Sequence, residues 1–400
     1  MKRICFLVDS VFSIGGVQRV TAVVAEALSL HYSVTIVTLD GAVAPSSRGL
    51  YGLSDAPLSV RFFAYPAVGR FKRLCCRAYS AVYRKCFGPL PTVSRRLSRL
   101  ASDAYAHSSF PAELRRALAA ELQQGGYDVV VGVHAPLAVR LASLRRELPG
   151  VRLVGWIHNS FEALFGPTSL YIGPDRRRHY VYQLMKLDAT VVLCRHDAEQ
   201  YRRYDGLMQP TVIYNPLTLT PGAPSSGTSH RFLAVGRFTP LHKGFDLLIE
   251  AFHRFARHDA LWRLDIVGEG PEEPLLRELI VRYGLQERVA LHPFTSDIQQ
   301  YYSQAQVYVL SSRWEGFGLV LVEAMAHGVP VVSAALPTSL EIMGDAALYF
   351  DVGDVAQMAE RMLEATRADW PRWSERARER ARRFDVEPIV EQWRNLFLRL

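Results

Sequence analysis

Glu315 and Glu323 stand in one short segment with seven residues between them. A strand is expected to end near Leu310 and a helix to begin near Leu319, so one carboxylate lies in the loop and the other on the helix. Carboxylates accept strong hydrogen bonds from hydroxyl groups, and this pair therefore suits the hydroxyls of a sugar or a ribose. For the pair taken alone, a solvated loop glutamate and a helix-surface glutamate are an equally good interpretation.

The loop between these glutamates has the composition of an anion-binding helix start. Its two glycines, Gly316 and Gly318, allow the backbone to approach a ligand closely. At the N-terminus of a helix the backbone N–H groups lack intrahelical partners, and the helix dipole favours a negative charge. The N–H groups expected there belong to Gly316, Phe317, Gly318 and Leu319.

Two cations follow another expected strand, residues 231–235. Arg237 comes directly after it, and Lys243 stands at the start of the next helix. Two such cations can clamp a diphosphate and stabilise its charge as it leaves. The plainer interpretation is a strand-end arginine and a surface lysine.

Two glycine turns connect further strands to helices. Gly268 and Gly270 follow the strand at 263–267, where they serve either a ligand or only a tight turn. Gly15 and Gly16 join the first strand to the first helix. Because that turn lacks a full G-x-G-x-x-G pattern, a dinucleotide cofactor is not expected there.

A histidine is the remaining candidate. His158 follows the expected strand at 151–157, where a titratable ring can face a ligand, although a histidine at a strand end is more often structural. His134, after the strand at 128–133, is the weaker alternative.

These candidates are spaced by alternating strands and helices. The first half is expected to have strands at 3–9, 33–39, 128–133, 151–157 and 190–193, with a helix at 17–30. In the second half the strands are at 231–235, 263–267, 289–291, 307–310 and 330–333, with helices at 244–257, 274–283, 297–304 and 319–327. Continuous apolar strands alternating with helices predict two doubly wound α/β domains with parallel sheets.

The expected domains are 1–217 and 231–385. Residues 217–230, rich in Pro, Gly, Ser and Thr, have the composition of a flexible linker. An amphipathic helix within 386–400 is expected to pack back onto the N-terminal domain. Ligands of such folds bind at the carboxyl ends of the strands, so we expect a cleft between the two domains.

Composition limits the class of protein. The 400 residues are 49% hydrophobic and 22% charged, as in a soluble globular enzyme. The apolar run near the N-terminus is interrupted by Asp9, and no run of about 18 apolar residues occurs, so neither an export signal nor a spanning helix is expected. The five cysteines form no C-x-x-C pair. A cytoplasmic protein without a structural metal or disulfides is therefore expected.

Charge is unevenly distributed along the chain. The net charge is +8, and residues 56–102 contain ten Lys or Arg and no acidic residue. The same stretch contains the aromatic residues Phe62, Phe63, Tyr65, Phe71, Tyr79, Tyr83 and Phe87. A basic surface with interleaved aromatics suits an anionic membrane or an acidic acceptor, and a solvated pair of basic helices is the plain alternative. Its three cysteines, Cys75, Cys76 and Cys86, are expected to be buried.

Taken together, these segments resemble the GT4 family of retaining glycosyltransferases, which have the GT-B fold of two Rossmann-like domains facing a central cleft. The family signature is a glutamate, seven residues and a second glutamate, which residues 315–323 match as EGFGLVLVE. The resemblance extends over residues 231–350, including VGRFTPLHKGFDLLIEAF and DIVGEGPEEPLLREL. Residues 334–342 depart from it, because they lack the glycines that many relatives have before the Glu341-Ile342 pair.

The resemblance implies a role for each candidate. Glu315 would contact the transferred sugar, and Glu323 the ribose. The diphosphate of the donor would be bound by Arg237 and Lys243. The remaining candidates would lie near the base (Gly268, Gly270), near the donor phosphate and sugar (Gly15, Gly16) and near the donor sugar (His158). The family needs no metal, and the leaving phosphate can take the proton from the acceptor hydroxyl.

The expected function is therefore sugar transfer from a nucleoside diphosphate sugar, more readily UDP- than GDP-linked, to an envelope glycan or a lipid-linked acceptor. The same fold can instead support an epimerase or hydrolase of nucleotide sugars. A non-catalytic binding protein has no need for Arg237, Lys243, Glu315 and Glu323 together. Nucleic-acid binding is suggested only by the basic pI of about 9.3, and no nucleic-acid motif accompanies it.

Overall fold

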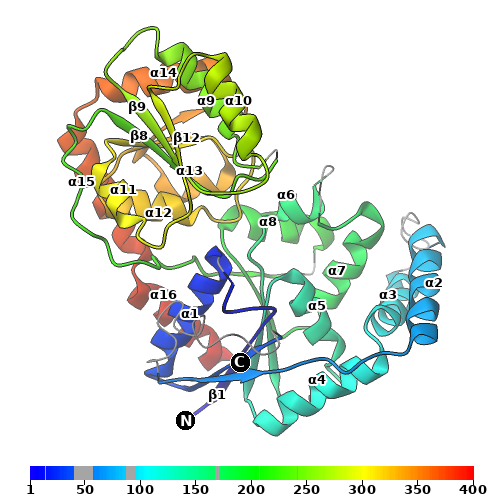
Figure 1. Ribbon diagram of the computed structural model, residues 1–400. Helices are drawn as coiled ribbons and strands as arrows, with labels where there is room; N and C mark the ends of the chain where they lie inside the picture. The colour runs from blue at the N-terminus through cyan, green and yellow to red at the C-terminus, as the bar shows by residue number, and fades with distance from the viewer. Residues whose placement is uncertain are drawn as a thin grey trace. The chain divides into compact units, whose positions relative to one another are not determined.

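The computed structural model describes residues 1–13, 15–39, 57–86, 95–166, 169, 171–206, 208–240 and 242–400. These residues form two compact units, which are coloured along the chain in Figure 1. Unit 1 consists of Met1–Pro216 together with Val386–Leu400, and unit 2 of Leu217–Asp385. Each contains a parallel sheet with helices packed against it, which confirms the predicted class of two doubly wound α/β sheets.

In unit 1 the described strands form a seven-stranded parallel sheet in the order β3-β2-β1-β4-β5-β6-β7. The strands are β1 (Arg3–Val8), β2 (Ser33–Thr38), β3 (Ser59–Phe62), β4 (Val129–Val133), β5 (Arg152–Trp156), β6 (Ala189–Val192) and β7 (Thr211–Val212). The helices are α1 (Gly16–Ser29), α2 (Arg70–Cys86), α3 (Arg95–Ser109), α4 (Ala112–Gly125), α5 (Ala135–Ser143), α6 (Phe161–Phe165), α7 (Arg177–Leu184), α8 (Arg195–Asp205) and α16 (Val386–Arg399), with the short η3 (Pro174–Arg176). The central strands β1 and β4 are buried almost throughout, as expected of strands covered on both faces.

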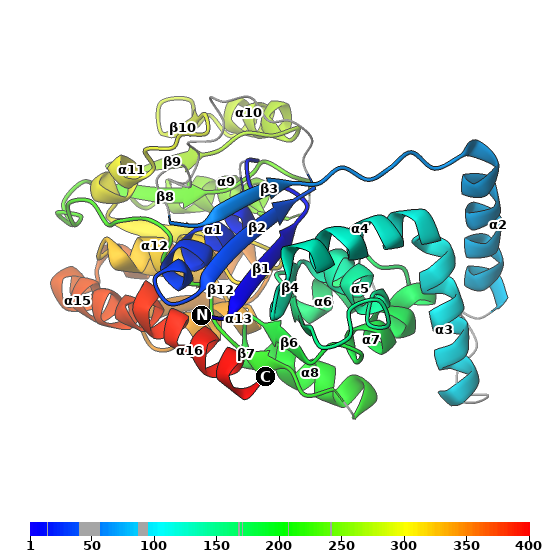
Figure 2. The ribbon, with the colours of Figure 1, turned by 90° about the horizontal axis from the view of Figure 1, so that it is seen from below.

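Helix α16 completes the core of unit 1 although it is distant in sequence. It packs beside α1 (Figure 2). The Trp393 ring is fully buried and meets the Trp156 ring of β5 edge-on at 4.8 Å. Near the N-terminus of the chain, Lys2 donates a hydrogen bond of 2.8 Å to the carbonyl oxygen of Phe397.

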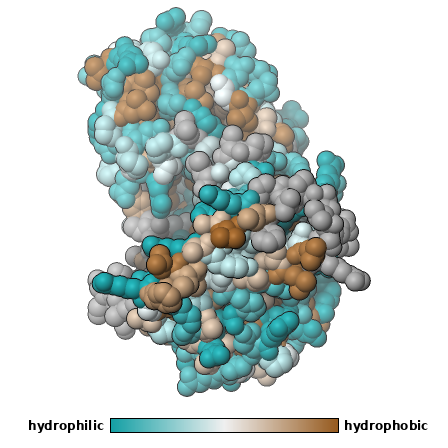
Figure 3. All heavy atoms as spheres, turned by 90° about the vertical axis from the view of Figure 1, so that its right-hand side faces the viewer, coloured by the Kyte–Doolittle hydropathy of each residue, from teal (hydrophilic) through white to brown (hydrophobic). Residues whose placement is uncertain are grey.

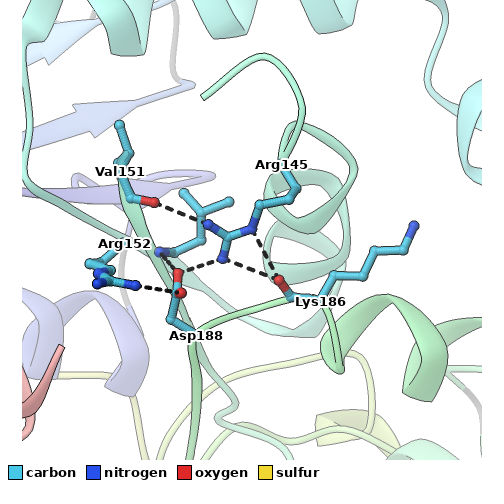
Figure 4. Close-up of polar contacts among 6 residues, drawn as sticks. Arg145, Val151, Arg152, Lys186 and Asp188 are labelled. Carbon is cyan, nitrogen blue, oxygen red and sulfur yellow. Dashed lines mark hydrogen bonds and ion pairs between the residues drawn. The ribbon is translucent and has the colours of Figure 1, made fainter. Parts of the chain in front are cut away.

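The amino ends of β5 and β6 are held by one arginine (Figure 4). The Arg145 guanidinium donates to the carbonyl oxygens of Val151 and Lys186, at 3.1 and 3.2 Å, and pairs with the Asp188 carboxylate. Asp188 also accepts the Leu153 N–H at 2.7 Å. Burial opposes ionisation of Asp188, but Arg145, the Leu153 N–H and Arg152 together outweigh it and lower the pKa of that carboxyl. The cluster fixes the strands at the edge opposite to the one where ligands bind in such sheets.

In unit 2 the described strands form a six-stranded parallel sheet in the order β10-β9-β8-β11-β12-β13. The strands are β8 (Arg231–Val235), β9 (Arg263–Val267), β10 (Val289–His292), β11 (Val307–Leu310), β12 (Val331–Ala334) and β13 (Ala347–Phe350). The helices are α9 (Phe245–Phe255), α10 (Glu273–Arg282), α11 (Gln299–Gln304), α12 (Leu319–Ala326), α13 (Pro337–Met343), α14 (Val355–Thr366) and α15 (Trp370–Ala381), followed by η4 (Arg382–Phe384).

The expectation of a flexible linker at residues 217–230 is wrong. These residues belong to unit 2 and are hydrogen-bonded to it along their length. The Gly222 N–H donates to Nε2 of His327 at 3.1 Å, and the Ser225 N–H donates to the His327 carbonyl oxygen at 3.1 Å. Gly227 lies directly against the Trp370 ring, where a Cβ atom would come within 2.4 Å of it. Composition alone does not reveal such anchors, because backbone groups and distant side chains supply them.

The basic stretch forms two helices, α2 and α3, that lie beside each other at the rim of unit 1 (Figures 1 and 2). Several of its aromatics do not face solvent as expected. Phe63 and Tyr65 pack on the core, and Tyr83 is only 4% exposed. Phe62 stacks on Phe12 at 5.7 Å but is itself 39% exposed. Phe87 lies outside the described residues.

The cysteines of this stretch are likewise not buried as expected. Cys75 and Cys86 are exposed, and Cys76 is half-buried. The reason is that α2 stands at the rim and buries little more than Tyr83. Within the described part of the chain, no helix combines the length and the apolar character needed to cross a membrane.

Candidate active site

The candidate residues of unit 2 lie where its sheet changes direction. Chain order runs outward from β8 on one side and from β11 on the other, so the loops after these two strands face each other at the carboxyl edge. This switch point is where ligands bind in doubly wound sheets. Arg237 and Lys243 follow β8, and Glu315 follows β11.

Glu315 and Lys243 form a buried ion pair across this switch point. Lys243 Nζ lies 2.6 Å from Glu315 Oε1, and the two side chains are only 14% and 8% exposed. The Ser312 hydroxyl donates to the same carboxylate oxygen at 2.6 Å. The sequence does not reveal Ser312, because its role depends on the turn that brings its hydroxyl to the Glu315 carboxylate.

Burial opposes ionisation of Glu315, yet its pKa lies below the ordinary value. Lys243, His242 and the Ser312 hydrogen bond together outweigh the loss of solvation. His242 stacks on Trp314 with the ring centroids 4.9 Å apart and bonds through Nε2 to the Trp314 carbonyl oxygen at 3.0 Å. Burial and then Lys243 lower the pKa of His242. The carboxylate is therefore held ionised and ready to accept a hydrogen bond.

The loops that bring Lys243 and Glu315 together are locked by close backbone contact. Gly244 has a φ of 65°, and a Cβ atom there would lie 2.2 Å from the carbonyl oxygen of Ser311. The Ser311 hydroxyl in turn donates to the Lys243 carbonyl oxygen at 2.8 Å. Only glycine combines this left-handed conformation with such an approach, so Gly244 fixes the register of the two loops.

The glycines after β9 have a packing role. A Cβ atom on Gly268 would lie 1.9 Å from the carbonyl oxygen of Gly236, and one on Gly270 would lie 2.4 Å from that of Phe238. The Phe238 N–H also donates to the Glu269 carbonyl oxygen at 2.8 Å. Thus the loop after β9 supports the loop that carries the exposed Arg237.

Glu323 is deeply buried in α12, at 2% exposure. The Tyr302 hydroxyl donates to its Oε2 at 2.9 Å, and the Tyr302 ring stacks on His327 at 5.0 Å. The interpretation of Glu315 and Glu323 as two solvated carboxylates is therefore wrong. Gly318 caps this helix with a φ of 84°, which starts α12 at Leu319 as predicted. The side chain of the preceding residue, Phe317, packs edge-on against the Phe384 ring, so its side chain does not cover the backbone N–H groups at the start of α12.

In unit 1 the switch point lies between β1 and β4, which Gly15 and His134 follow, and His158 follows the neighbouring β5. His158 is 7% exposed, packed against the Trp156 ring at 4.4 Å. Neither of its ring nitrogens has a hydrogen-bond partner among the described residues. Burial and then the adjacent His134 lower the pKa of His158 well below the ordinary value. A buried ring with two unpaired nitrogens suits a ligand that supplies a hydrogen bond.

His134 stands beside His158, with ring centroids 5.5 Å apart, in a strained backbone conformation. Its φ of 77° and ψ of 150° lie in a region that is nearly restricted to glycine. Burial lowers its pKa, while Asp9 at the end of β1 and Asn159 partly oppose this. Such strain clusters at functional sites, which makes His134 a stronger candidate than its sequence position suggested.

Gly15 and Gly16 form the start of α1 after β1. Gly15 is extended, with a φ of 174°, so its backbone requires no glycine. A Cβ atom there would meet the Gln18 side-chain oxygen at 2.3 Å, a contact with the end of a flexible side chain. What distinguishes Gly15 is therefore its place at the switch point.

Two units that each contain a parallel α/β sheet have the architecture of the GT-B glycosyltransferases. The family follows from direct comparison. The model for Glycosyltransferase Family 4 matches residues 14–221, and that for Glycosyl transferases group 1 matches residues 229–367. The chain belongs to glycosyltransferase family 4, a family of retaining enzymes.

Relatives and solved structures agree with this assignment. An uncharacterised glycosyltransferase of Haemophilus influenzae is 23% identical over 408 residues, covering 99% of this chain and 100% of that protein. The amylovoran biosynthesis glycosyltransferase AmsD of Erwinia amylovora is 34% identical over 123 residues, covering 30% of this chain and 34% of its own. The fold is shared with HepE of Anabaena in complex with UDP and glucose, with a TM-score of 0.74, 19% identity and full coverage of both chains.

Proposed function

We propose that this glycosyltransferase moves a sugar from a UDP-linked donor to a growing polysaccharide or its lipid-linked precursor. The observation that carries the proposal is the buried pair of Lys243 and Glu315 at the switch point of unit 2, with the N-terminus of α12 on the same loop. Lys243 and the N-terminus of α12 suit the diphosphate, and Glu315 suits the sugar hydroxyls.

Charge development explains how these groups would act. The bond between the anomeric carbon and the phosphate oxygen breaks, and the negative charge of the leaving diphosphate grows. Lys243, Arg237 and the amides that precede α12 stabilise that charge. The new bond to the acceptor oxygen forms on the same face, and the acceptor proton passes to the departing phosphate oxygen. Glu315 positions the sugar, and Glu323 accepts a hydrogen bond from the ribose.

The donor and acceptor classes are supported by similar proteins. HepE, which shares the fold, has been crystallised with UDP and glucose. AmsD, similar over part of its length, acts in amylovoran biosynthesis. HepE supports a UDP-sugar donor, and AmsD supports a role in polysaccharide biosynthesis.

A thermal-shift screen of UDP- and GDP-sugars tests the donor, because a ligand that binds the folded state raises Tm. We expect UDP-sugars to raise Tm more than GDP-sugars, and the gain to be lost in Lys243→Ala. The stabilising donor is then incubated with and without lipid-linked glycan acceptors. Consumption of donor at the same rate without any acceptor would instead support a nucleotide-sugar hydrolase or epimerase.

A further inference from the structure

Helix α2 exposes a stripe of large apolar side chains. Phe71 is 80% exposed, Leu74 63% and Val82 52%. Positions three and eleven residues beyond Phe71 lie on the same face of a helix as Phe71 itself. The adjacent α3 exposes Leu97 and Leu100 by 61% and 66%. In the space-filling view from the side of these helices, hydrophobic patches interrupt the hydrophilic surface (Figure 3).

The stripe is not the face by which α2 joins the protein. Tyr83 stacks on Tyr105 of α3 at 4.2 Å, and Tyr105 meets the ring of His179 on α7 edge-on at 4.7 Å. Tyr83 lies about 120° around the helix from Phe71, at roughly 100° per residue. The face that packs on the protein and the apolar stripe are therefore different faces of α2, and the stripe stays exposed while Tyr83 is packed.

Positive charge borders the stripe on the side of Leu74. At about 100° per residue, Arg70, Arg77 and Lys85 lie within about 60° of Leu74 around the helix. Helix α2 has no acidic residue, and its cations are Arg70, Lys72, Arg73, Arg77, Arg84 and Lys85. Lys72 pairs with Glu113 of α4. Within the part of the chain that the structure describes, no acidic group forms an ion pair with Arg70, Arg77 or Lys85. These cations can therefore interact with an external anionic surface.

We propose that α2 and α3 dock on an anionic phospholipid bilayer, with Phe71, Leu74 and Val82 inserted at the level of the headgroups. A bilayer interface accepts both components, because cations meet lipid phosphates while apolar side chains enter the acyl boundary. With nucleic acid only the cations would contribute to binding, because its phosphate backbone offers no apolar environment for bulky aliphatic side chains. The proposal is independent of the transfer reaction, because lipid binding is measured without a sugar nucleotide.

Co-sedimentation of the full chain with vesicles tests this surface. We expect binding to vesicles that contain phosphatidylglycerol and little binding to pure phosphatidylcholine. Replacing both Phe71→Ser and Leu74→Ser should lower the partition coefficient at least ten-fold. The double variant Arg70→Gln and Arg77→Gln should lower it about 25-fold, because each cation near an anionic surface contributes about 1 kcal/mol, a factor of about five.

The matched control is Leu261→Ser with Val281→Ser, which removes two comparably exposed side chains, 71% and 62%, from unit 2. This variant should bind vesicles like wild type, and all variants should keep the wild-type Tm. Equal binding of wild type to both lipids, or unchanged binding of the Phe71–Leu74 variant, would overturn the proposal. Tighter binding to a DNA duplex than to vesicles, or a dimer abolished by Phe71→Ser, would also overturn it in favour of that other partner.

Discussion

At the scale of single residues, the structure mostly keeps the candidate site residues predicted from the sequence but changes how strongly each is supported. The sequence identified Glu315, Lys243 and Glu323 because their types and spacing match a chemistry. It did not identify Ser312, whose role depends on the turn that brings its hydroxyl to the Glu315 carboxylate. It ranked His134 low, because a backbone conformation with φ of 77° cannot be read from residue types.

Removing either clamp cation should impair transfer strongly. Lys243→Ala and Arg237→Ala are each expected to lower turnover at least ~100-fold, the scale of losing one preorganised anion stabiliser. Measurement of steady-state kcat with donor and acceptor tests this prediction. If both variants kept wild-type rates, the proposed role of the cations would be wrong.

Loss of the Ser312 hydroxyl should shift the pH profile rather than abolish activity. The Ser312 hydrogen bond helps to lower the pKa of Glu315, so Ser312→Ala raises that pKa. The acid limb of kcat/KM should then move to higher pH, with about a ten-fold loss below neutral pH, the scale of a charge-assisted hydrogen bond. The exposed Ser226→Ala serves as the control and should leave the profile in place.

The strain at His134 makes a prediction about stability. A conformation of this kind costs on the order of 1–3 kcal/mol for a residue with a side chain and little for glycine. His134→Gly should therefore have a higher free energy of unfolding than His134→Ala, measured by urea denaturation. The opposite order would show that the backbone of His134 is not strained. Both variants should transfer sugar more slowly than wild type if the ring contributes to the site.

At the scale of elements, periodicity predicted the strands and helices that build the two switch points. β8, β9 and β11 have the predicted bounds, because buried strands read as short apolar runs. The edge strands β3, β7 and β13 and the helices α4 to α8 and α13 to α15 were not predicted. β7 spans only two residues, too few for a periodic signal, and α15 is dominated by charged residues. The anchoring of residues 217–230 was missed because it depends on contacts with His327 and Trp370.

The junction of α3 and α7 should be sensitive to acid. Burial lowers the pKa of His179 to about 4, and its Nδ1 bonds to the Ser102 hydroxyl at 2.9 Å. The unfolded chain, with an ordinary histidine pKa near 6.5, binds more protons than the folded chain between these values. The contribution of the buried, neutral His179 to the free energy of unfolding is therefore complete above about pH 6.5 and is lost as the pH falls toward about 4.

His179→Gln should remove this part of the acid sensitivity, a slope of at most about 1.4 kcal/mol per pH unit. Urea denaturation of wild type and variant between pH 7.5 and 4.5 measures it, with the exposed His258→Gln as control. Parallel curves for wild type and His179→Gln would contradict the assignment.

At the scale of the whole molecule, the chain passes from unit 1 to unit 2 and then returns. Unit 2 is inserted between Pro216 and Val386, and its two ends are joined by a hydrogen bond of 2.7 Å from the Leu217 N–H to the Phe384 carbonyl oxygen. The sequence predicted two sheets and a final amphipathic helix. It could not show that Trp393 would meet Trp156, because no periodicity relates residues so far apart.

Truncating Trp393 should therefore destabilise the unit that contains the beginning of the chain. Trp393→Ala removes a fully buried ring and should cost about 3–5 kcal/mol in the unfolding of unit 1. Hydrogen exchange should show faster exchange in β1 and β5 and little change in β8 and β11. Leu398→Ala, on the same helix but 69% exposed, is the matched control. Uniform loss of protection in both units would contradict this prediction.

The return of the chain also has a consequence for biosynthesis. Unit 1 lacks α16 until the ribosome has translated the 169 residues of Leu217–Asp385 and the helix that follows them. At about 5–20 residues per second, the nascent N-terminal sheet waits roughly ten to forty seconds with the site for Trp393 unfilled. During that interval its apolar surface is a natural target for a chaperone, whereas unit 2 can fold as soon as its own residues have emerged.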